Sequence, residues 1–208
     1  MKATEGIETE GLVLASGNEH KAGEIEAWLR ARDLRIRVRT AAAFGGMAGC
    51  GETAEDFEGN ARIKVEFLRP KVPPGSWILA DDSGLEVDAL GGGPGVRSAR
   101  FAGEGAGDRR NRELLLERMR DFPSARRRTA RFVCVLALAE GPGPVEFFRG
   151  ECEGRILPHP AGAGGFGYDP VFAPRGSGRS FAEIPAAEKN RISHRAKALE
   201  KLGDRLRI

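Results

Sequence analysis

The adjacent carboxylates of Asp81 and Asp82 are the strongest candidates in this chain for binding a metal ion or taking part in catalysis. They follow an apolar run at residues 77–80 and precede Ser83 and Gly84. A short apolar run bounded by proline and glycine is typical of a buried strand. A carboxylate pair at the end of such a strand is costly without a cation, and Mg²⁺ often joins one or two carboxylates to substrate phosphates. The pair therefore indicates a metal site, with a solvated Asp-Asp-Ser-Gly turn as the alternative.

A second candidate lies at residues 16–21, between an expected strand and an expected helix. Its residues are Ser16, Gly17, Asn18, Glu19, His20 and Lys21. Backbone N–H groups at such a junction bind anions. Lys21 opposes the helix dipole, and a bound phosphate would remove that conflict. Because the Walker spacing is not present, the segment predicts an anion site of another kind, and an ordinary Ser-Gly-Asn turn is the alternative.

A glycine-rich segment at residues 162–170 matches the dinucleotide-binding fingerprint by letter. Prolines precede it and Tyr-Asp-Pro follows it, so neither the strand nor the helix of a Rossmann site fits there. We therefore reject that site. Phe166, Tyr168 and Asp169 instead suit a flat ring, with an aromatic face for stacking and a carboxylate for an edge. A tight turn with an aromatic side chain in the core is the alternative.

A fourth candidate consists of Lys189, His194 and Arg195. On one straight helix Lys189 and His194 would lie about 140° apart, so they could not share a face. Ser193 is a good N-cap, which predicts a break and places His194 and Arg195 in the first turn of the last helix. Cations oppose the dipole there, and a ligand acceptor would explain them, whereas ordinary surface residues are the alternative.

The elements expected around these candidates alternate. We expect strands at residues 12–15 and 36–38, helices at 21–31 and 56–69, a helix from Asp108 to 119 that Asp108 caps, a hairpin of strands at 129–139 and 145–152, and a last helix ending near Leu206. Parallel units followed by a long hairpin predict an α/β fold around a mixed central sheet.

Length and charge narrow the class of protein. A chain of 208 residues can bury about 70% of its unfolded surface, so we expect one domain over residues 11–208 after a disordered lead-in at 1–10. The net charge is +3, which calls for neither nucleic acid nor a membrane and suits an anionic small molecule. No apolar run approaches the ~20 residues of a membrane span, and the start is too polar for a signal peptide. Three cysteines without ligand spacing indicate reduced thiols in a cytoplasmic protein.

Taken together, these segments resemble the inosine triphosphate pyrophosphatase family. The matching stretches lie at residues 14–18 with Lys21, 80–104, 131–132, 164–172, 181–183, 188–190 and 192–195, in the family's order. The resemblance implies an elongated α/β fold with helices flanking the sheet, two lobes with an active-site cleft between them, and a homodimer. It also implies Mg²⁺-dependent hydrolysis of ITP, dITP and XTP to the monophosphate and pyrophosphate, by attack of water at the α-phosphate. That activity would cleanse the nucleotide pool of deaminated purines.

The same resemblance implies roles for individual residues. The segment from Ser16 to Lys21 would hold the triphosphate, Asp82 would ligate Mg²⁺ and act as general base, and Ser83 would touch substrate. The residues expected around the base, sugar and phosphate are Phe166, Gly167, Tyr168, Asp169, Lys189, His194 and Arg195.

The chain departs from the family pattern at the second metal ligand. The family usually carries Glu-Glu-Thr-Gly and then Glu-Asn-Ala, where this chain has Gly51-Glu52-Thr53-Ala54 and Gly59-Asn60-Ala61, with Lys64 retained. Glu52 is the natural metal partner of Asp82, although a shift of one residue would change that assignment.

Three other functions stay open. A pyrophosphatase acting on standard or pyrimidine nucleotides would share the phosphate and metal sites. The absence of acidic residues at Gly51 and Gly59 would also suit a non-catalytic nucleotide-binding module. A nucleic-acid binder built on the arginines at 126–128 is the weakest, because such a run usually forms a solvated edge.

Overall fold

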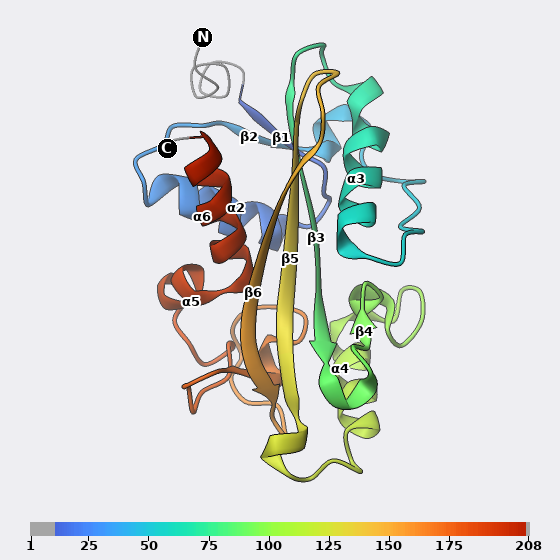
Figure 1. Ribbon diagram of the computed structural model, residues 1–208, viewed down its shortest axis with the longest axis vertical. Coiled ribbons are helices and arrows are strands. Elements are labelled where there is room, and N and C mark those ends of the chain that lie inside the picture. The colour runs from blue at the N-terminus through green and yellow to red at the C-terminus, as the bar shows by residue number, and fades with distance from the viewer. Residues whose placement is uncertain (1–10, 207–208) are drawn as a thin grey trace. The chain divides into compact units, whose positions relative to one another are not determined.

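The computed structural model describes residues 11–206, so the expected lead-in lies outside the described residues. Its strands form a seven-stranded sheet of order β2-β1-β3-β5-β6-β7, with β4 paired to β3 (Figure 1). The strands are β1 (Leu12–Leu14), β2 (Val38–Thr40), β3 (Trp77–Val87), β4 (Pro94–Gly95), β5 (Thr129–Glu140), β6 (Glu146–Ile156) and β7 (Phe172–Pro174). The pairs of β1 with β2 and β3 are parallel, whereas β3–β4 and β6–β7 are antiparallel. The predicted mixed α/β sheet and its hairpin, β5–β6, are confirmed.

The five α-helices of the described part are α2 (Glu19–Arg30), α3 (Phe57–Leu68), α4 (Gly107–Arg118), α5 (Ala186–Ile192) and α6 (His194–Leu206). Asp56 caps α3, where its carboxylate accepts a hydrogen bond from the Gly59 amide. Ser193 separates α5 from α6 in an extended conformation, so the predicted break is confirmed. Between residues 11 and 206, no helix is long and apolar enough to cross a bilayer.

The chain divides into two compact units. Among the described residues, unit 1 comprises 11–82, 134–150 and 195–206, and unit 2 comprises 83–133 and 151–194. The strands β3, β5 and β6 contribute to both units. A single domain and a cleft between two lobes stay predictions.

Each unit has its own hydrophobic core. In unit 1, α2 buries Ala22, Ile25, Trp28 and Leu29, the face that its sequence period predicts, against residues of the sheet and of α6. In unit 2, the core is rich in aromatic side chains, and the rings of Phe132 and Phe172 meet edge to face with centroids 4.7 Å apart. These cores fix the strand ends and helix ends that carry the candidate residues.

Two local expectations are wrong. The strand that was expected to end at residue 80 continues to Val87, so Asp81 and Asp82 lie inside β3. Basic side chains from neighbouring elements neutralise this pair, and the strand can therefore carry it. Asp108 does not cap α4, because the helix begins at Gly107 and its N-cap, Ala106, makes no side-chain cap. Its carboxylate accepts a hydrogen bond from Gly167 instead.

Candidate functional site

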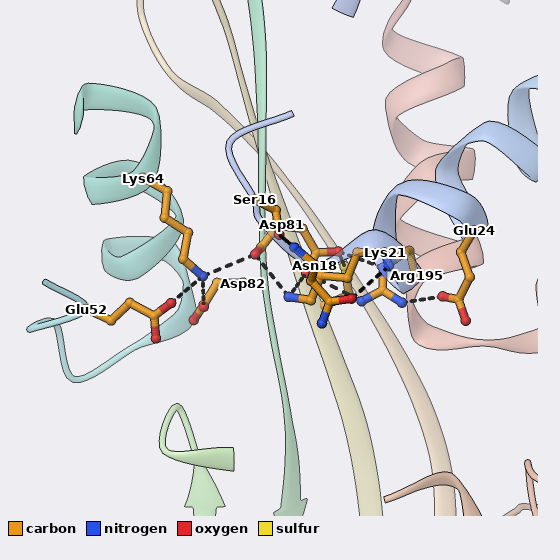
Figure 2. Close-up of polar contacts among 10 residues, drawn as sticks. Ser16, Asn18, Lys21, Glu24, Glu52, Lys64, Asp81, Asp82 and Arg195 are labelled. Carbon is orange, nitrogen blue, oxygen red and sulfur yellow. Dashed lines mark hydrogen bonds and ion pairs between the residues drawn. The ribbon is translucent and has the colours of Figure 1, made fainter. Parts of the chain in front are cut away.

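The loop between β1 and α2 is fixed by its own side chains. The Asn18 carboxamide oxygen accepts a hydrogen bond from the Lys21 amide at 3.2 Å and caps α2, and the Ser16 hydroxyl accepts one from the Asn18 amide at 3.1 Å (Figure 2). Gly17 is exposed, and a Cβ built there would have no atom within 4 Å. Glu19 and His20 are exposed in the first turn of α2. The backbone at Gly17 is therefore open to the close approach of a ligand.

Asp81 is a fully buried carboxylate held by two cations. Its Oδ2 accepts a hydrogen bond from Arg195 Nε at 2.7 Å, and its Oδ1 accepts one from Lys21 Nζ at 2.5 Å. The Cys134 thiol lies 3.4 Å from Oδ2. Burial on its own would raise the pKa of Asp81, but Arg195 and then Lys21 outweigh it and hold that pKa well below its usual value. Asp81 stays ionised and joins α2, β3 and α6.

This contact changes the interpretation of Lys21. The sequence suggested that a bound phosphate would offset a cation at the helix N-terminus, whereas the buried Asp81 carboxylate already does so. The side chain of Lys21 is 14% exposed, so it still reaches the surface beside the loop. Its contact with a phosphate stays a prediction.

Asp82 faces a different set of partners. Lys64 Nζ donates to Asp82 Oδ1 at 2.6 Å and lies 2.8 Å from Glu52 Oε1. The second oxygen, Asp82 Oδ2, is buried and has no hydrogen-bond partner within residues 11–206. Burial raises the pKa of Asp82 and outweighs the opposing effect of Lys64. Burial would lower the pKa of Lys64, but Asp82 and Glu52 outweigh it and raise that pKa, so Lys64 stays charged.

The two neighbouring carboxylates thus point to opposite sides of β3, as alternate strand residues do (Figure 2). A buried carboxylate oxygen without a partner is costly and is the kind of atom that a hard cation satisfies. No group of three or more acidic, histidine or cysteine side chains with metal-binding geometry occurs in the part of the chain that the structure describes. The donor set fits an ion held by Asp82 and Glu52 that takes its other oxygen ligands from substrate or water.

Arg195 has little freedom to meet a ligand. Its side chain is 1% exposed, its Nε is bonded to Asp81, and its Nη1 is paired with Glu24 (Figure 2). The expected contact of Arg195 with a base stays a prediction, and the structure gives this residue a second role as the main counter-charge of Asp81.

In unit 2, Phe166 lies in a loop that is held by a buried ion pair. Asp169 Oδ2 accepts hydrogen bonds from Lys189 Nζ at 2.6 Å and from the Phe166 amide at 2.9 Å. Both charged side chains are almost fully buried, and Lys189 Nζ lies 4.7 Å from the centroid of the Phe166 ring. A Cβ at Gly165 would lie 2.0 Å from Asp169 Oδ2, which leaves no space for a side chain. The loop thus presents a half-buried aromatic ring beside a cation.

The other residues expected near the base differ in their surroundings. Tyr168 is buried, and its hydroxyl donates to the backbone carbonyl of Ser98 at 2.8 Å, so the alternative of a core aromatic holds for this side chain. Burial raises the pKa of Tyr168, which keeps the hydroxyl protonated as a donor. His194 is buried and stacks on Phe132 with ring centroids 4.7 Å apart. Ser83 is half-buried on β3.

Residues 12–205 match the family model described as the Ham1 family. The chain belongs to the Ham1 family. The dITP/XTP pyrophosphatase of Opitutus terrae is 50% identical over 197 residues, covering 93% of this chain and 97% of that protein. The dITP/XTP pyrophosphatase of Desulfotalea psychrophila is 42% identical over 92% of this chain and 82% of its own length.

Solved structures agree with this family assignment. A HAM1 protein from Coxiella burnetii superposes with a TM-score of 0.82 at 39% identity, covering 94% of this chain and 98% of that one. The nucleoside-triphosphatase / dITP/XTP pyrophosphatase from Mycobacterium abscessus gives a TM-score of 0.73 at 37% identity, covering 92% and 98%. The family resemblance expected from the sequence is confirmed.

Packing explains one of this chain's departures from the Ham1 family pattern. The resemblance implies glycine at the position of Ala54 and glutamate at that of Gly59. In this chain a Cβ at Gly59 would lie 2.5 Å from the Ala54 Cβ. The same Cβ would lie 2.8 Å from Asp56 Oδ1, so the Ala54 methyl group and the Asp56 carboxylate together leave no space for a side chain at position 59. The acid missing from position 59 is therefore linked to local packing.

Lys64 is a site residue that the sequence did not predict, although it pairs with both Glu52 and Asp82 in this Ham1 family chain. Lys64 lies four residues after Asn60, whose buried carboxamide bonds both backbone groups of Ala54 and ties that loop to α3. A lysine on the buried face of an amphipathic helix is unusual without a partner, and that signal could have identified it.

Proposed function

We propose that this chain hydrolyses non-canonical purine nucleoside triphosphates, namely ITP, dITP and XTP, to the monophosphate and pyrophosphate. The observation that carries the proposal is the pair of carboxylates, Glu52 and Asp82, that one buried cation, Lys64, holds on one side of β3. The relatives named dITP/XTP pyrophosphatase support this substrate class. The role we propose is removal of deaminated purines from the nucleotide pool.

Mg²⁺ is the cofactor in this proposal. Glu52 and the partnerless oxygen of Asp82 would hold it, since both offer the hard oxygen ligands that it prefers. When bound, Mg²⁺ supplies neutralisation of the negative charge on the phosphates. Lys64 keeps the two carboxylates together and stays charged while it does so.

In this proposal Asp82 takes the proton from the water that attacks the α-phosphate. A general base must lie within hydrogen-bond reach of the proton that it takes, and a carboxylate beside the ion would have that reach to a water there. The Ser16 and Asn18 amides already donate to the Leu14 carbonyl and the Ser16 hydroxyl, so the backbone at Gly17, where open space admits a phosphate oxygen, is the part of this loop that would stabilise charge on the leaving pyrophosphate. Lys21 adds a positive charge at the same loop.

We place recognition of the base in unit 2. The Phe166 ring offers a stacking surface, and His194 and Lys189 supply polar groups for the edge of the purine. A donor opposite O6 pairs with hypoxanthine or xanthine but meets another donor in adenine. A site whose buried polar groups are left unpaired by the wrong substrate can discriminate by as much as ~10⁴–10⁵.

A pyrophosphate-release assay across ITP, dITP, XTP, GTP, ATP and pyrimidine triphosphates, with Mg²⁺ and with a chelator, tests the proposal. We expect turnover of the first three that the chelator abolishes. Equal rates on the standard nucleotides would favour a pyrophosphatase of broad specificity, and nucleotide binding without turnover would favour a non-catalytic module.

We also propose that the chain acts in the cytoplasm as a homodimer. The thiols of Cys50, Cys134 and Cys152 suit a reducing compartment, and the dimer rests on the family resemblance alone. Light scattering on the purified protein would give about twice the mass of one 22.4 kDa chain.

A further inference from the structure

Two side chains of helix α4 bond both backbone groups of Gly167, in the loop that carries Phe166. Asp108 Oδ2 accepts a hydrogen bond from the Gly167 amide at 2.7 Å, and Arg112 Nη1 donates to the Gly167 carbonyl at 2.7 Å. Residues four apart lie on the same face of a helix, so one face of α4 satisfies both backbone groups of Gly167. The backbone position of Gly167 is therefore fixed relative to α4.

The residue before Gly167 is fixed as well. The Phe166 amide donates to Asp169, whose carboxylate is also held by Lys189. The Phe166 ring therefore projects from a backbone that is tied on one side to α4 and on the other to α5. Asp108 and Arg112 hold the backbone at Gly167, next to Phe166, so their effect on a stacked base would pass through that backbone.

Helix α4 is itself a firm support. The buried Asn111 accepts a hydrogen bond from the Ala102 amide at 2.8 Å and donates to the Ala99 carbonyl at 3.0 Å. Leu115, on the following turn, is fully buried in the core of unit 2. Polar contacts of Asn111 and apolar contacts of Leu115 therefore anchor α4, from which Asp108 and Arg112 contact the loop.

We propose that Asp108 and Arg112 are positioning residues that hold the Phe166 ring in place for stacking on the purine base. This inference rests on the proposed function, and it adds two residues that touch neither substrate nor metal. The inference predicts that Asp108 and Arg112 affect the affinity for the nucleotide, through the loop, and do not affect the rate of the chemical step.

The first test is amide hydrogen exchange of the loop at residues 162–169, measured by mass spectrometry without nucleotide. Asp108→Ala and Arg112→Met each remove one hydrogen bond to the Gly167 backbone. We expect hydrogen exchange of the loop amides to accelerate about 3- to 10-fold, the change for one lost hydrogen bond. Asp108→Asn keeps an acceptor and should stay near the wild type. Arg109→Met is the matched control, because Arg109 is exposed on the same helix and pairs only with Glu113 among its described contacts.

The second test is steady-state kinetics with ITP. Asp108→Ala and Arg112→Met should raise KM about 3- to 10-fold with kcat within about twofold of the wild type. In a Phe166→Ala background the same substitutions should change KM no further, because their effect passes through the ring. A general loss of structure would instead add to the effect of Phe166→Ala and lower kcat.

Unchanged amide hydrogen exchange of the loop in both variants would show that Asp108 and Arg112 do not hold the loop. Faster exchange with an unchanged KM, or additive effects in the Phe166→Ala background, would overturn the positioning role. A wild-type protein without turnover of ITP would refute the proposed function, and the positioning role with it, whereas the exchange result would still decide whether α4 holds the loop.

Discussion

Replacing each of the two neighbouring aspartates by asparagine should separate stability from catalysis. Asp81→Asn and Asp82→Asn change one carboxylate to an amide of the same shape on the same strand. Asp81 is bonded to Arg195 and Lys21, whereas Asp82 shares Lys64 with Glu52 and has one oxygen without a partner. We expect the first substitution to cost stability and the second to cost activity.

The magnitude for Asp81 follows from its burial. Loss of one partner from a buried ion pair costs about 3–5 kcal/mol, because the remaining charge is left without compensation. Arg195 keeps its contact with Glu24, and the amide oxygen still accepts one hydrogen bond, so the lower end of that range applies. For a chain of 208 residues, at about 2–4 °C per kcal/mol, this gives a fall in Tm of about 6–12 °C.

For Asp82→Asn we expect a small change in stability and a large loss of activity. Burial already disfavours its charged form, and Lys64 keeps Glu52 as a partner after the substitution. Asp82→Asn should therefore shift Tm by less than about 3 °C without metal, of the order of 1 kcal/mol or less. Loss of the proposed base and metal ligand should lower kcat by at least about 10²-fold.

Two measurements on the wild type and both variants test this. Thermal unfolding in the presence of a chelator gives Tm, and pyrophosphate release from ITP with Mg²⁺ gives kcat. Asp82→Asn with more than about a tenth of wild-type turnover would refute its role in the reaction. A smaller loss of Tm for Asp81→Asn than for Asp82→Asn would refute the assignment of the two faces of β3.

Four further substitutions have expected outcomes. Lys21→Ala should lower the free energy of unfolding by about 1.5–3 kcal/mol in chemical denaturation, because it removes a charged hydrogen bond to the buried carboxylate of β3. Gly17→Ala has space for its methyl group and should leave Tm unchanged, yet raise KM for ITP if phosphate contacts this backbone; an unchanged KM would place the phosphate elsewhere. Gly59→Ala should destabilise by about 1–3 kcal/mol through overpacking, and the double variant with Ala54→Gly should recover the part of that loss that comes from the Ala54 methyl group, because the contact with Asp56 Oδ1 remains. His194→Phe keeps a ring against its neighbour and removes the ring nitrogens, so the ratio of kcat/KM for ITP over ATP should fall about 10-fold or more; equal losses on both nucleotides would assign His194 to packing.

The sequence alone determined the features that depend on neighbours in the chain. The buried face of α2, the β5–β6 hairpin and the break at Ser193 follow from periodicity, turn residues and capping, which act over a few residues. The family resemblance follows in the same way, from short motifs in a fixed order. Even the opposite orientation of Asp81 and Asp82 could be expected, since side chains alternate along any strand.

Only the tertiary structure decided which partner each of these side chains meets. Arg195 reaches Asp81 across 114 residues of chain, and Lys21 reaches it across 60, so no local pattern could pair them. The same holds for Asp108, which local propensity assigns to a helix cap and which packing assigns to Gly167. A carboxylate has the same sequence signature whether a buried cation, a metal ion or a backbone amide satisfies it. The choice among them depends on which segments the two cores bring within hydrogen-bond distance.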